Sequence, residues 1–129
     1  MEPGCTKKTQ KEKGEIIMDS KEWIAVKELR EALDSKFGQD IVVMDLNEVT
    51  TIADFFVIAT ASSTPQMQSL ADTTENIMKK HKIAIHHIEG LHGGEWVLLD
   101  FGAIMVHLFN KESRDFYKLE RLWGDAKMV

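Results

Sequence analysis

The stretch Phe55-Phe56-Val57-Ile58-Ala59-Thr60-Ala61, followed by Ser62-Ser63-Thr64-Pro65, decides the fold class. Its first seven residues are apolar almost throughout, which is typical of a strand covered on both faces in the middle of a sheet. Thr64 with Pro65 indicates a helix start, because proline suits the first helical position and the threonine oxygen can cap. This helix should run to about Lys82. A buried strand followed directly by a helix favours an α/β protein.

Two more elements are expected before this pair. Apolar residues at helical spacing predict an amphipathic helix that starts at Asp19 or Ser20 and ends at Gly38, with the glycine in the left-handed conformation. Residues 41–46 form a short β-branched run that indicates a strand. The apolar stripe of the helix comprises Trp23, Val26, Leu29, Leu33 and Phe37.

The chain after the central pair predicts three strands and a helix. Residues 83–88 are expected to be the strand to which the preceding helix returns, which would complete a right-handed strand-helix-strand unit. Residues 95–101 and 104–109 are joined at Gly102 and Ala103, which indicates a tight hairpin. A closing helix is expected over residues 112–123, with Phe116, Leu119 and Trp123 on one side.

Length and composition predict a single domain. The 129 residues, of which 43% are hydrophobic, suffice for one core and not for two ordinary domains. Residues 1–17 lack apolar periodicity and are expected to be a flexible leader, and residues 18–129 are expected to form the domain. The whole is predicted to be an α/β domain with a mixed sheet of about five strands flanked by helices.

Location and partners are constrained by charge and by apolar runs. The longest apolar run is far shorter than the roughly 20 residues that span a bilayer, so no membrane association is expected. The N-terminus has no apolar core of a secretory signal, and Cys5 has no second cysteine to pair with, so a cytoplasmic location is expected. A net charge of −5 repels a phosphate backbone. The acidic domain therefore favours a basic protein partner over direct, sequence-specific nucleic-acid binding.

The usual catalytic constellations are missing from the sequence. No Gly-x-x-x-x-Gly-Lys motif occurs, and Asp45-Leu46-Asn47 supplies one acid where magnesium-dependent nucleotidyl transfer needs a pair. Ser62 and Ser63 lack a nucleophile elbow and are expected to cap the helix. No metal site is expected at the one cluster of candidate ligands, since neighbouring residues of a strand point to opposite faces and leave only His87 with Glu89. That cluster comprises His86, His87, Glu89 and His92.

Trp96 is the residue that the fold alone does not explain. On a strand it shares a face with Leu98 and Asp100, whereas the aliphatic residues between them occupy the other face. If the aliphatic face is core, Trp96 and Leu98 form an exposed patch flanked by carboxylates, as expected of an aromatic anchor with a charged rim. The alternative is that Trp96 packs beneath a terminal helix.

Several linked segments between about Ser20 and Ala126 resemble the ribosomal silencing factor family, also called the Iojap family. The resemblance implies an α/β fold related to nucleotidyltransferases without their catalytic motif, no cofactor, and a homodimer when free. It also implies a non-enzymatic translation repressor that binds the L-fourteen protein of the large ribosomal subunit and blocks joining of the small subunit. Two features depart from the family: Ala61 stands where a glycine is common, and the leader has no counterpart. The matching segments are residues 40–46, 52–60, 89–90, 95–102, 106–109 and 117–123.

The docking surface expected on this basis centres on Trp96 as the apolar anchor, with carboxylates facing lysines or arginines of the ribosomal protein. Its residues are Glu89, Glu95, Trp96, Leu98 and Asp100. His107 and Asp54 are expected to be structural, because they lie in or beside buried strands. The alternative function is a degenerate nucleotidyltransferase-like enzyme or nucleotide-binding protein, which the missing acid pair opposes.

Overall fold

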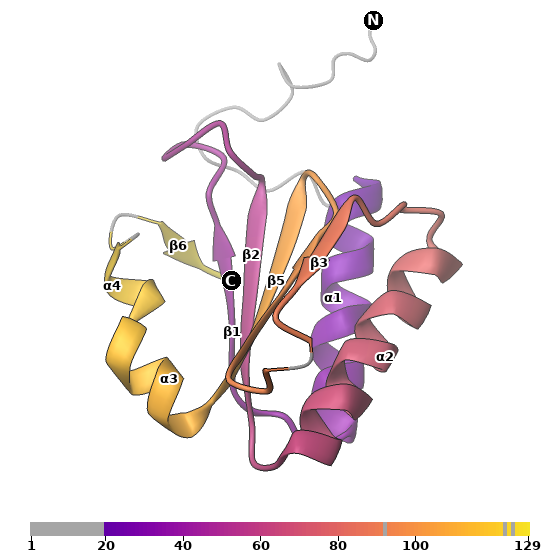
Figure 1. Ribbon diagram of the computed structural model, residues 1–129. Helices are drawn as coiled ribbons and strands as arrows, with labels where there is room; N and C mark the ends of the chain where they lie inside the picture. The colour runs from indigo at the N-terminus through magenta and orange to yellow at the C-terminus, as the bar shows by residue number, and fades with distance from the viewer. Residues whose placement is uncertain (1–19, 92, 123, 125) are drawn as a thin grey trace, which may run out of the picture.

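The computed structural model describes residues 20–91, 93–122, 124 and 126–129, and it has the expected α/β architecture (Figure 1). The sheet has six strands, one more than the expected five or so. The expected leader, residues 1–17, lies outside the described residues. The elements in chain order are α1 (Lys21–Ser35), β1 (Gln39–Asp45), β2 (Phe55–Ala61), α2 (Thr64–Lys80), β3 (His87–Glu89), β4 (Trp96–Asp100), β5 (Ile104–Asn110), α3 (Lys111–Tyr117), α4 (Leu119–Leu122) and β6 (Lys127–Met128).

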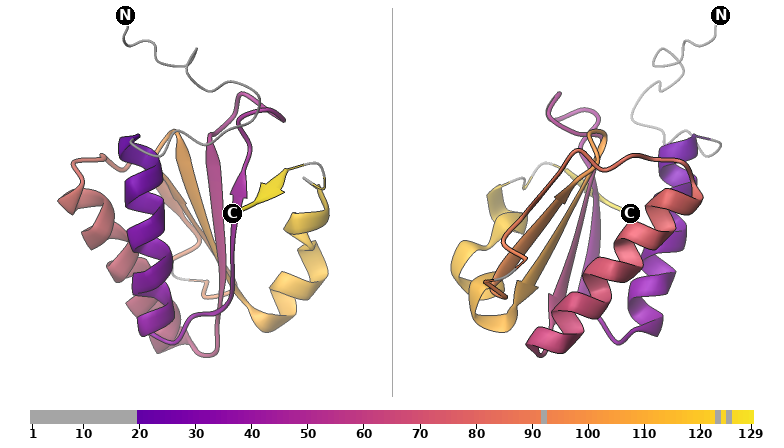
Figure 2. Two further views of the ribbon diagram at one scale, coloured as in Figure 1. Left: turned by 180° about the vertical axis from the view of Figure 1, so that it is seen from behind. Right: turned by 45° about the vertical axis from the view of Figure 1, so that its right-hand side comes forward.

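The strands are ordered β3-β4-β5-β2-β1-β6 across the sheet. β2 and β5 pair in parallel, and the other four pairs of described strands are antiparallel. Helices α1 and α2 cover one face, whereas α3 and α4 lie on the other, so the sheet forms the middle of three layers (Figure 2). Within the described chain, no helix is long and apolar enough to cross a membrane.

The predicted strand over residues 83–88 is largely wrong. Residues 83–86 form no strand, and β3 begins at His87, where it pairs antiparallel with β4 at the edge of the sheet. The parallel partner of β2 is β5, so the crossover from β2 includes α2, β3 and β4. The physical reason is burial: every residue of β2 is buried, which requires a long apolar neighbour, and β5 supplies one whereas residues 84–87 are exposed.

The predicted cap of α1 is confirmed at Ser20, whose side chain accepts a hydrogen bond from the Trp23 amide. The predicted end is wrong by one residue, because Phe37 and not Gly38 takes the left-handed conformation, with φ 68°. Phe37 was also expected in the apolar stripe of the helix, but it is 78% exposed. Gly38 is still needed there: its amide donates to the Leu33 carbonyl at 2.9 Å, and an added Cβ would lie 3.1 Å from that oxygen. A glycine is therefore favoured at position 38 by this hydrogen bond and the close approach of the Leu33 carbonyl, and not by a left-handed backbone conformation.

The start of α2 and the closing helix also differ in detail. Ser63, not Thr64, is the N-cap residue of α2, and its side chain accepts from the Gln66 amide. The expected closing helix is broken at Lys118, where a φ of 46° separates α3 from α4. This break leaves Phe116 79% exposed, although it was expected on the buried side. Trp123, expected on the same side, lies outside the described residues.

Each face of the sheet has its own core. The face under α1 and α2 has the larger core, in which Val57, Leu99 and Val106 of the sheet and Leu29 and Leu33 of α1 are fully buried. The opposite face carries a smaller core, which is partly covered by α4 and includes aromatic side chains. Its buried residues are Met44, Leu46, Ala53, Phe56, Ile58, Phe109 and Leu119.

Candidate functional site

The strand register places most of the expected docking residues on one face of the sheet. Glu89 lies opposite Leu98, which lies opposite His107, and Trp96 lies opposite Phe109. Directly paired residues of an antiparallel sheet share a face, so these side chains lie on the side away from α1 and α2. The predicted hairpin at Gly102 and Ala103 is confirmed, with φ 85° at the glycine. Glu95 lies just before β4, and its carbonyl accepts from the Asn110 amide at 2.9 Å.

Trp96 is half-buried and held from three sides. Its Nε1 donates a hydrogen bond of 3.1 Å to Nδ1 of His107. Its ring lies 4.9 Å from that of Phe109 and 4.6 Å from that of Tyr117, which belongs to α3. Both sequence alternatives are thus partly right, because Trp96 packs against a terminal helix and still keeps part of its surface open.

His107 is buried beside Trp96, as its expected structural role requires. Burial lowers the pKa of His107 from its ordinary value to about 4, so its ring is neutral at physiological pH. Since Nδ1 accepts from Trp96, the single ring proton lies on Nε2, which is buried and has no hydrogen-bond partner among the described residues. The Trp96 hydrogen bond therefore depends on the neutral form of this histidine.

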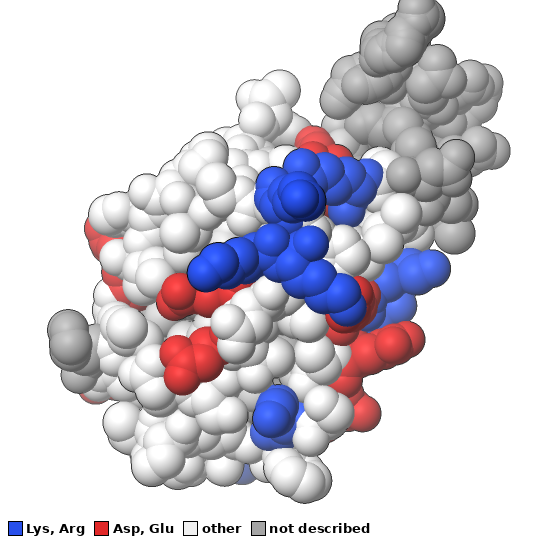
Figure 3. Space-filling model, turned by 90° about the vertical axis from the view of Figure 1, so that its right-hand side faces the viewer, with Lys and Arg blue, Asp and Glu red and all other residues white. Residues whose placement is uncertain are grey.

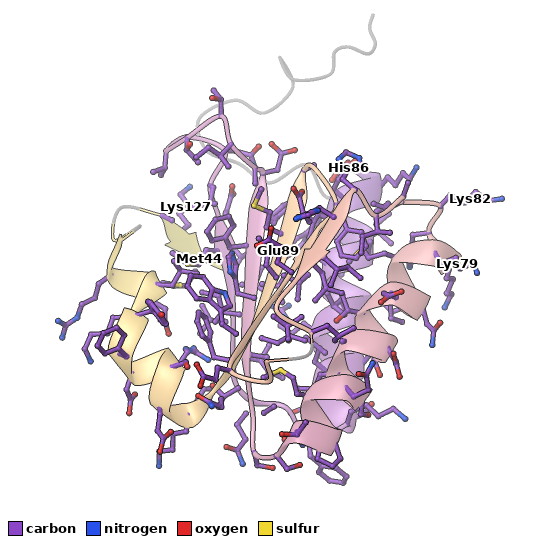
Figure 4. The ribbon with its side chains drawn as sticks, viewed as in Figure 1. Met44, Lys79, Lys82, His86, Glu89 and Lys127 are labelled. Atoms are coloured by element: carbon purple, nitrogen blue, oxygen red, sulfur yellow. The ribbon has the colours of Figure 1, made fainter. Side chains whose placement is uncertain are left out.

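The three carboxylates of the expected surface have different surroundings. Glu89 is exposed on β3, the edge strand of the sheet (Figure 4), and its Oε2 lies 2.7 Å from Nε2 of His87. Glu95 is exposed. Asp100 is half-buried and accepts from the Gly102 amide at 2.8 Å, so it also stabilises the hairpin turn. Glu89 and Glu95 are therefore the carboxylates accessible to a partner, although Glu89 also contacts His87, and Asp100 helps to hold the hairpin turn.

Two aromatic residues of this surface were not expected from the sequence. Tyr117 is 49% exposed and packs against Trp96 with the two rings tilted at 48°, and Phe116 contacts the Tyr117 ring edge-on at 5.0 Å. The tandem Phe116-Tyr117 was visible in the sequence, but a continuous helix over residues 112–123 would have turned Phe116 inward. The break at Lys118 is what exposes the pair.

The side chains considered above as possible catalytic or metal-binding groups make local hydrogen bonds. Asp45 Oδ1 accepts hydrogen bonds from the backbone and side-chain nitrogens of Asn47, at 3.0 and 2.7 Å, and Ser63 caps α2. His87 and Glu89 contact each other as expected, and no group of three or more potential metal ligands occurs within the described chain. His92 lies outside the part that the structure describes.

Comparison with known proteins assigns the family. Residues 18–129 match the family described as "Ribosomal silencing factor during starvation". The chain is 38% identical over 98 residues to ribosomal silencing factor RsfS of Halalkalibacterium halodurans, covering 76% of this chain and 84% of that protein. It is 36% identical to the Bacillus subtilis protein of the same name, with 76% and 83% covered. The chain belongs to the ribosomal silencing factor family.

Solved structures and a more distant relative agree with this assignment. A crystal structure of a protein from Chromobacterium violaceum superimposes with a TM-score of 0.74 at 35% identity, covering 78% of this chain and 84% of that one. A Bacillus halodurans structure superimposes with a TM-score of 0.68 at 31% identity, covering 81% and 95%. The chloroplastic protein Iojap of Arabidopsis thaliana is 35% identical over 107 residues, which are 81% of this chain and 43% of that protein. Family membership supports a ribosome-associated, regulatory role in silencing translation.

Proposed function

We propose that this protein represses translation without enzymatic activity, by binding the L-fourteen protein of the large ribosomal subunit and blocking the small subunit from joining. The observation that carries the proposal is the half-open Trp96 on a sheet face with exposed carboxylates nearby. Family membership supports the ribosome as the target. The proposed docking surface comprises Glu89, Glu95, Trp96, Leu98 and Asp100.

Trp96 suits an anchor because it is fixed before any partner arrives. The hydrogen bond to His107 and the rings of Phe109 and Tyr117 restrict its rotamers, so docking loses little side-chain entropy. Central tryptophans often supply much of an interface's binding energy. Tyr117 extends the apolar surface beside it and joins the proposed site.

Carboxylates at the rim would select a basic partner. Glu89 and Glu95 are exposed, so their charges act mainly on the association rate and on the choice of partner. A basic patch on the L-fourteen protein fits this arrangement. The same apolar face would pair with a second copy when no ribosome is present, and we therefore propose a homodimer for the free, cytoplasmic protein.

Steric blocking requires no chemical reaction. The local hydrogen bonds of the candidate catalytic side chains support a mechanism of this kind. Asp45 and Ser63, which could have served nucleotide or acyl chemistry, are bonded to neighbouring residues in turns and caps. A protein docked where the subunits meet would prevent joining by volume alone. Activity should accordingly scale with occupancy of the large subunit and not with nucleotide concentration.

Co-sedimentation with purified large subunits tests the proposal. The protein should pellet with large subunits, bind the isolated L-fourteen protein, and lower the yield of joined ribosomes when small subunits are added. Nucleoside triphosphates with magnesium should neither shift its melting temperature nor be consumed. Failure to bind large subunits at moderate salt would refute the proposal, and nucleotide turnover would favour the enzyme alternative.

A further inference from the structure

The end of α2 and the start of α1 bring together four lysines that we call the lysine patch: Lys21, Lys79, Lys80 and Lys82. Lys79 and Lys80 belong to the last turn of α2, and Lys82 follows its cap. Lys21 begins α1, and its Nζ donates to the Lys82 carbonyl at 3.1 Å although the two residues are 61 apart in sequence. Figure 3 shows the blue side chains gathered on this face, and Figure 4 shows Lys79 and Lys82 pointing outward.

The lysine patch keeps most of its charge uncompensated. Lys80 pairs with Glu28 at 2.6 Å, and hydrogen bonds from Lys80 and His81 lower the pKa of Glu28, so this carboxylate remains ionised. Among the described residues, no carboxylate pairs with Lys79 or Lys82. Lys21 is held by a neutral carbonyl and retains its charge. Three of the four positive charges are therefore available in a chain whose net charge is −5.

Helix stability does not account for the whole patch. Lysines in a last turn interact favourably with the helix dipole, which explains Lys79 and Lys80. Lys82 lies beyond the helix cap with a φ of 60°, and Lys21 is at the start of α1, where the dipole disfavours a cation. Lys21 has a structural contact through the Lys82 carbonyl, whereas the charge of Lys82 has no such role among the described residues.

The surface beside the lysine patch is concave. Lys79 lines a hollow of about 330 Å³ together with Glu75, Asn76, Ile83 and Ile85, so the hollow has one carboxylate as well as the lysine. An RNA strand can follow such a hollow with its phosphates on the lysines and its sugars against the amide and aliphatic groups. A lipid bilayer is flat on this scale, so the shape favours RNA over a membrane.

We propose that the lysine patch binds phosphates of ribosomal RNA next to the docked protein partner, an inference that rests on the proposed function. Residues 83–86 connect the patch directly to β3, which carries Glu89 of the proposed docking surface. The two surfaces have opposite charge and lie on opposite sides of the sheet, where residues 83–86 lead from one to the other around the β3 edge. A large subunit presents both basic protein and RNA, so one docking event can satisfy both surfaces.

The test compares two double variants with equal loss of charge. Lys79→Gln with Lys82→Gln removes two charges from the patch. Lys27→Gln with Lys36→Gln removes two exposed charges outside the patch and the docking surface, one within α1 and one at its C-cap. Affinity is measured against purified large subunits between about 50 and 200 mM salt, and against the isolated L-fourteen protein. Melting temperatures check that all variants are folded.

Loss of two phosphate contacts should reduce the salt dependence of subunit binding. With a slope of about −0.9 per phosphate, the fourfold rise in salt should weaken the wild type about tenfold more than the patch variant, and the control should match the wild type. The patch variant should bind the isolated L-fourteen protein normally. Equal salt slopes for the two double variants would overturn the inference, as would an equal loss of affinity for the L-fourteen protein, which would make the patch a protein contact. If the wild type binds large subunits but not the L-fourteen protein, the proposed function fails while the RNA contact stands.

Discussion

The two faces of the sheet differ in how completely they are covered. The face under α1 and α2 is closed: its aliphatic side chains such as Leu99 and Val106 have no exposed surface, and its aromatic residues are buried as well. The face toward α3 carries rings, a buried histidine and the half-open Trp96, and its cover is incomplete. The first face provides the apolar burial that drives folding. The second gives up part of that burial and keeps an aromatic side chain available for a partner.

Adjacent residues of β4 allow this contrast to be measured within one strand. Leu99 is fully buried under the helices, whereas Leu98 is half-buried on the other face. Leu99→Ala should lower the free energy of unfolding by about 2–5 kcal/mol, because it removes packed methyl groups and leaves a cavity. Leu98→Ala should cost clearly less stability and should weaken binding to large subunits. Denaturant unfolding and co-sedimentation of both variants provide the two readings.

If Leu98→Ala destabilises the fold as much as Leu99→Ala, the two faces are equivalent and the comparison fails. If both variants keep full affinity for large subunits once folded, the open face is not the docking surface. The same-strand design holds the strand and the side-chain type constant, so only the face of the sheet and its packing neighbours differ.

His107 makes the face toward α3 sensitive to pH, whereas the face under α1 and α2 has no titrating group of this kind among its buried residues. The pKa of His107 is lowered to about 4 in the folded protein, so the unfolded chain takes up a proton near pH 6.5 and the folded protein does not. The neutral, buried His107 therefore contributes its full stabilisation above about pH 6.5, and this contribution is lost as the pH falls toward 4. Between pH 7.5 and 4 the wild type should lose about 3 kcal/mol more than His107→Gln.

Unfolding free energies of both proteins at the two pH values test this prediction. Subtraction of the variant removes the contributions of the other histidines and the carboxylates. Parallel curves for the two proteins would mean that His107 is reached by solvent and titrates normally. A protein that also loses subunit affinity at low pH, in step with His107, would tie the histidine to the position of Trp96.

How far the sequence predicted the fold depended on the range of the interactions involved. Local signals such as the Ser20 cap, the hairpin at Gly102 and the buried run of β2 were identified correctly. The partner of β2 was wrong, since strand order is set by which apolar strand can cover it and not by proximity in the chain. Residues 83–86 have strand-like composition but remain outside the sheet.

The candidate site was also predictable only where local sequence signals determine it. Alternation along β4 correctly placed Trp96 and Leu98 on one face. The sequence could not reveal that His107 holds the indole, or that the break at Lys118 brings Tyr117 onto it, because both depend on contacts between separate elements. The lysine patch likewise joins Lys21 to the end of α2 across 61 residues.

Trp96→Ala removes the proposed anchor and should weaken binding to large subunits about thirtyfold, since a central tryptophan contributes about 2 kcal/mol or more. Trp96→Phe is the matched control: it keeps an aromatic ring and loses the donor to His107. Retention of most affinity in Trp96→Phe would assign the binding energy to ring contact, and an equal loss would assign it to the hydrogen-bonded orientation. Affinity is measured by co-sedimentation at fixed salt. A folded Trp96→Ala protein with unchanged affinity would place the anchor elsewhere.

Glu95→Lys should have the smallest effect, because Glu95 is exposed at the rim and solvent screens its charge. We expect affinity for large subunits to fall about two- to fivefold at low salt, mostly through slower association, and to approach the wild-type value as salt rises. Glu31→Lys makes the same change in charge at an exposed position of α1, on the opposite side of the sheet, and should leave binding almost unchanged. Association rates at several salt concentrations decide the matter. Equal slowing by both variants would mean that the net charge of the protein matters and that the rim has no particular role, whereas a salt-independent loss would make Glu95 a buried contact of the interface.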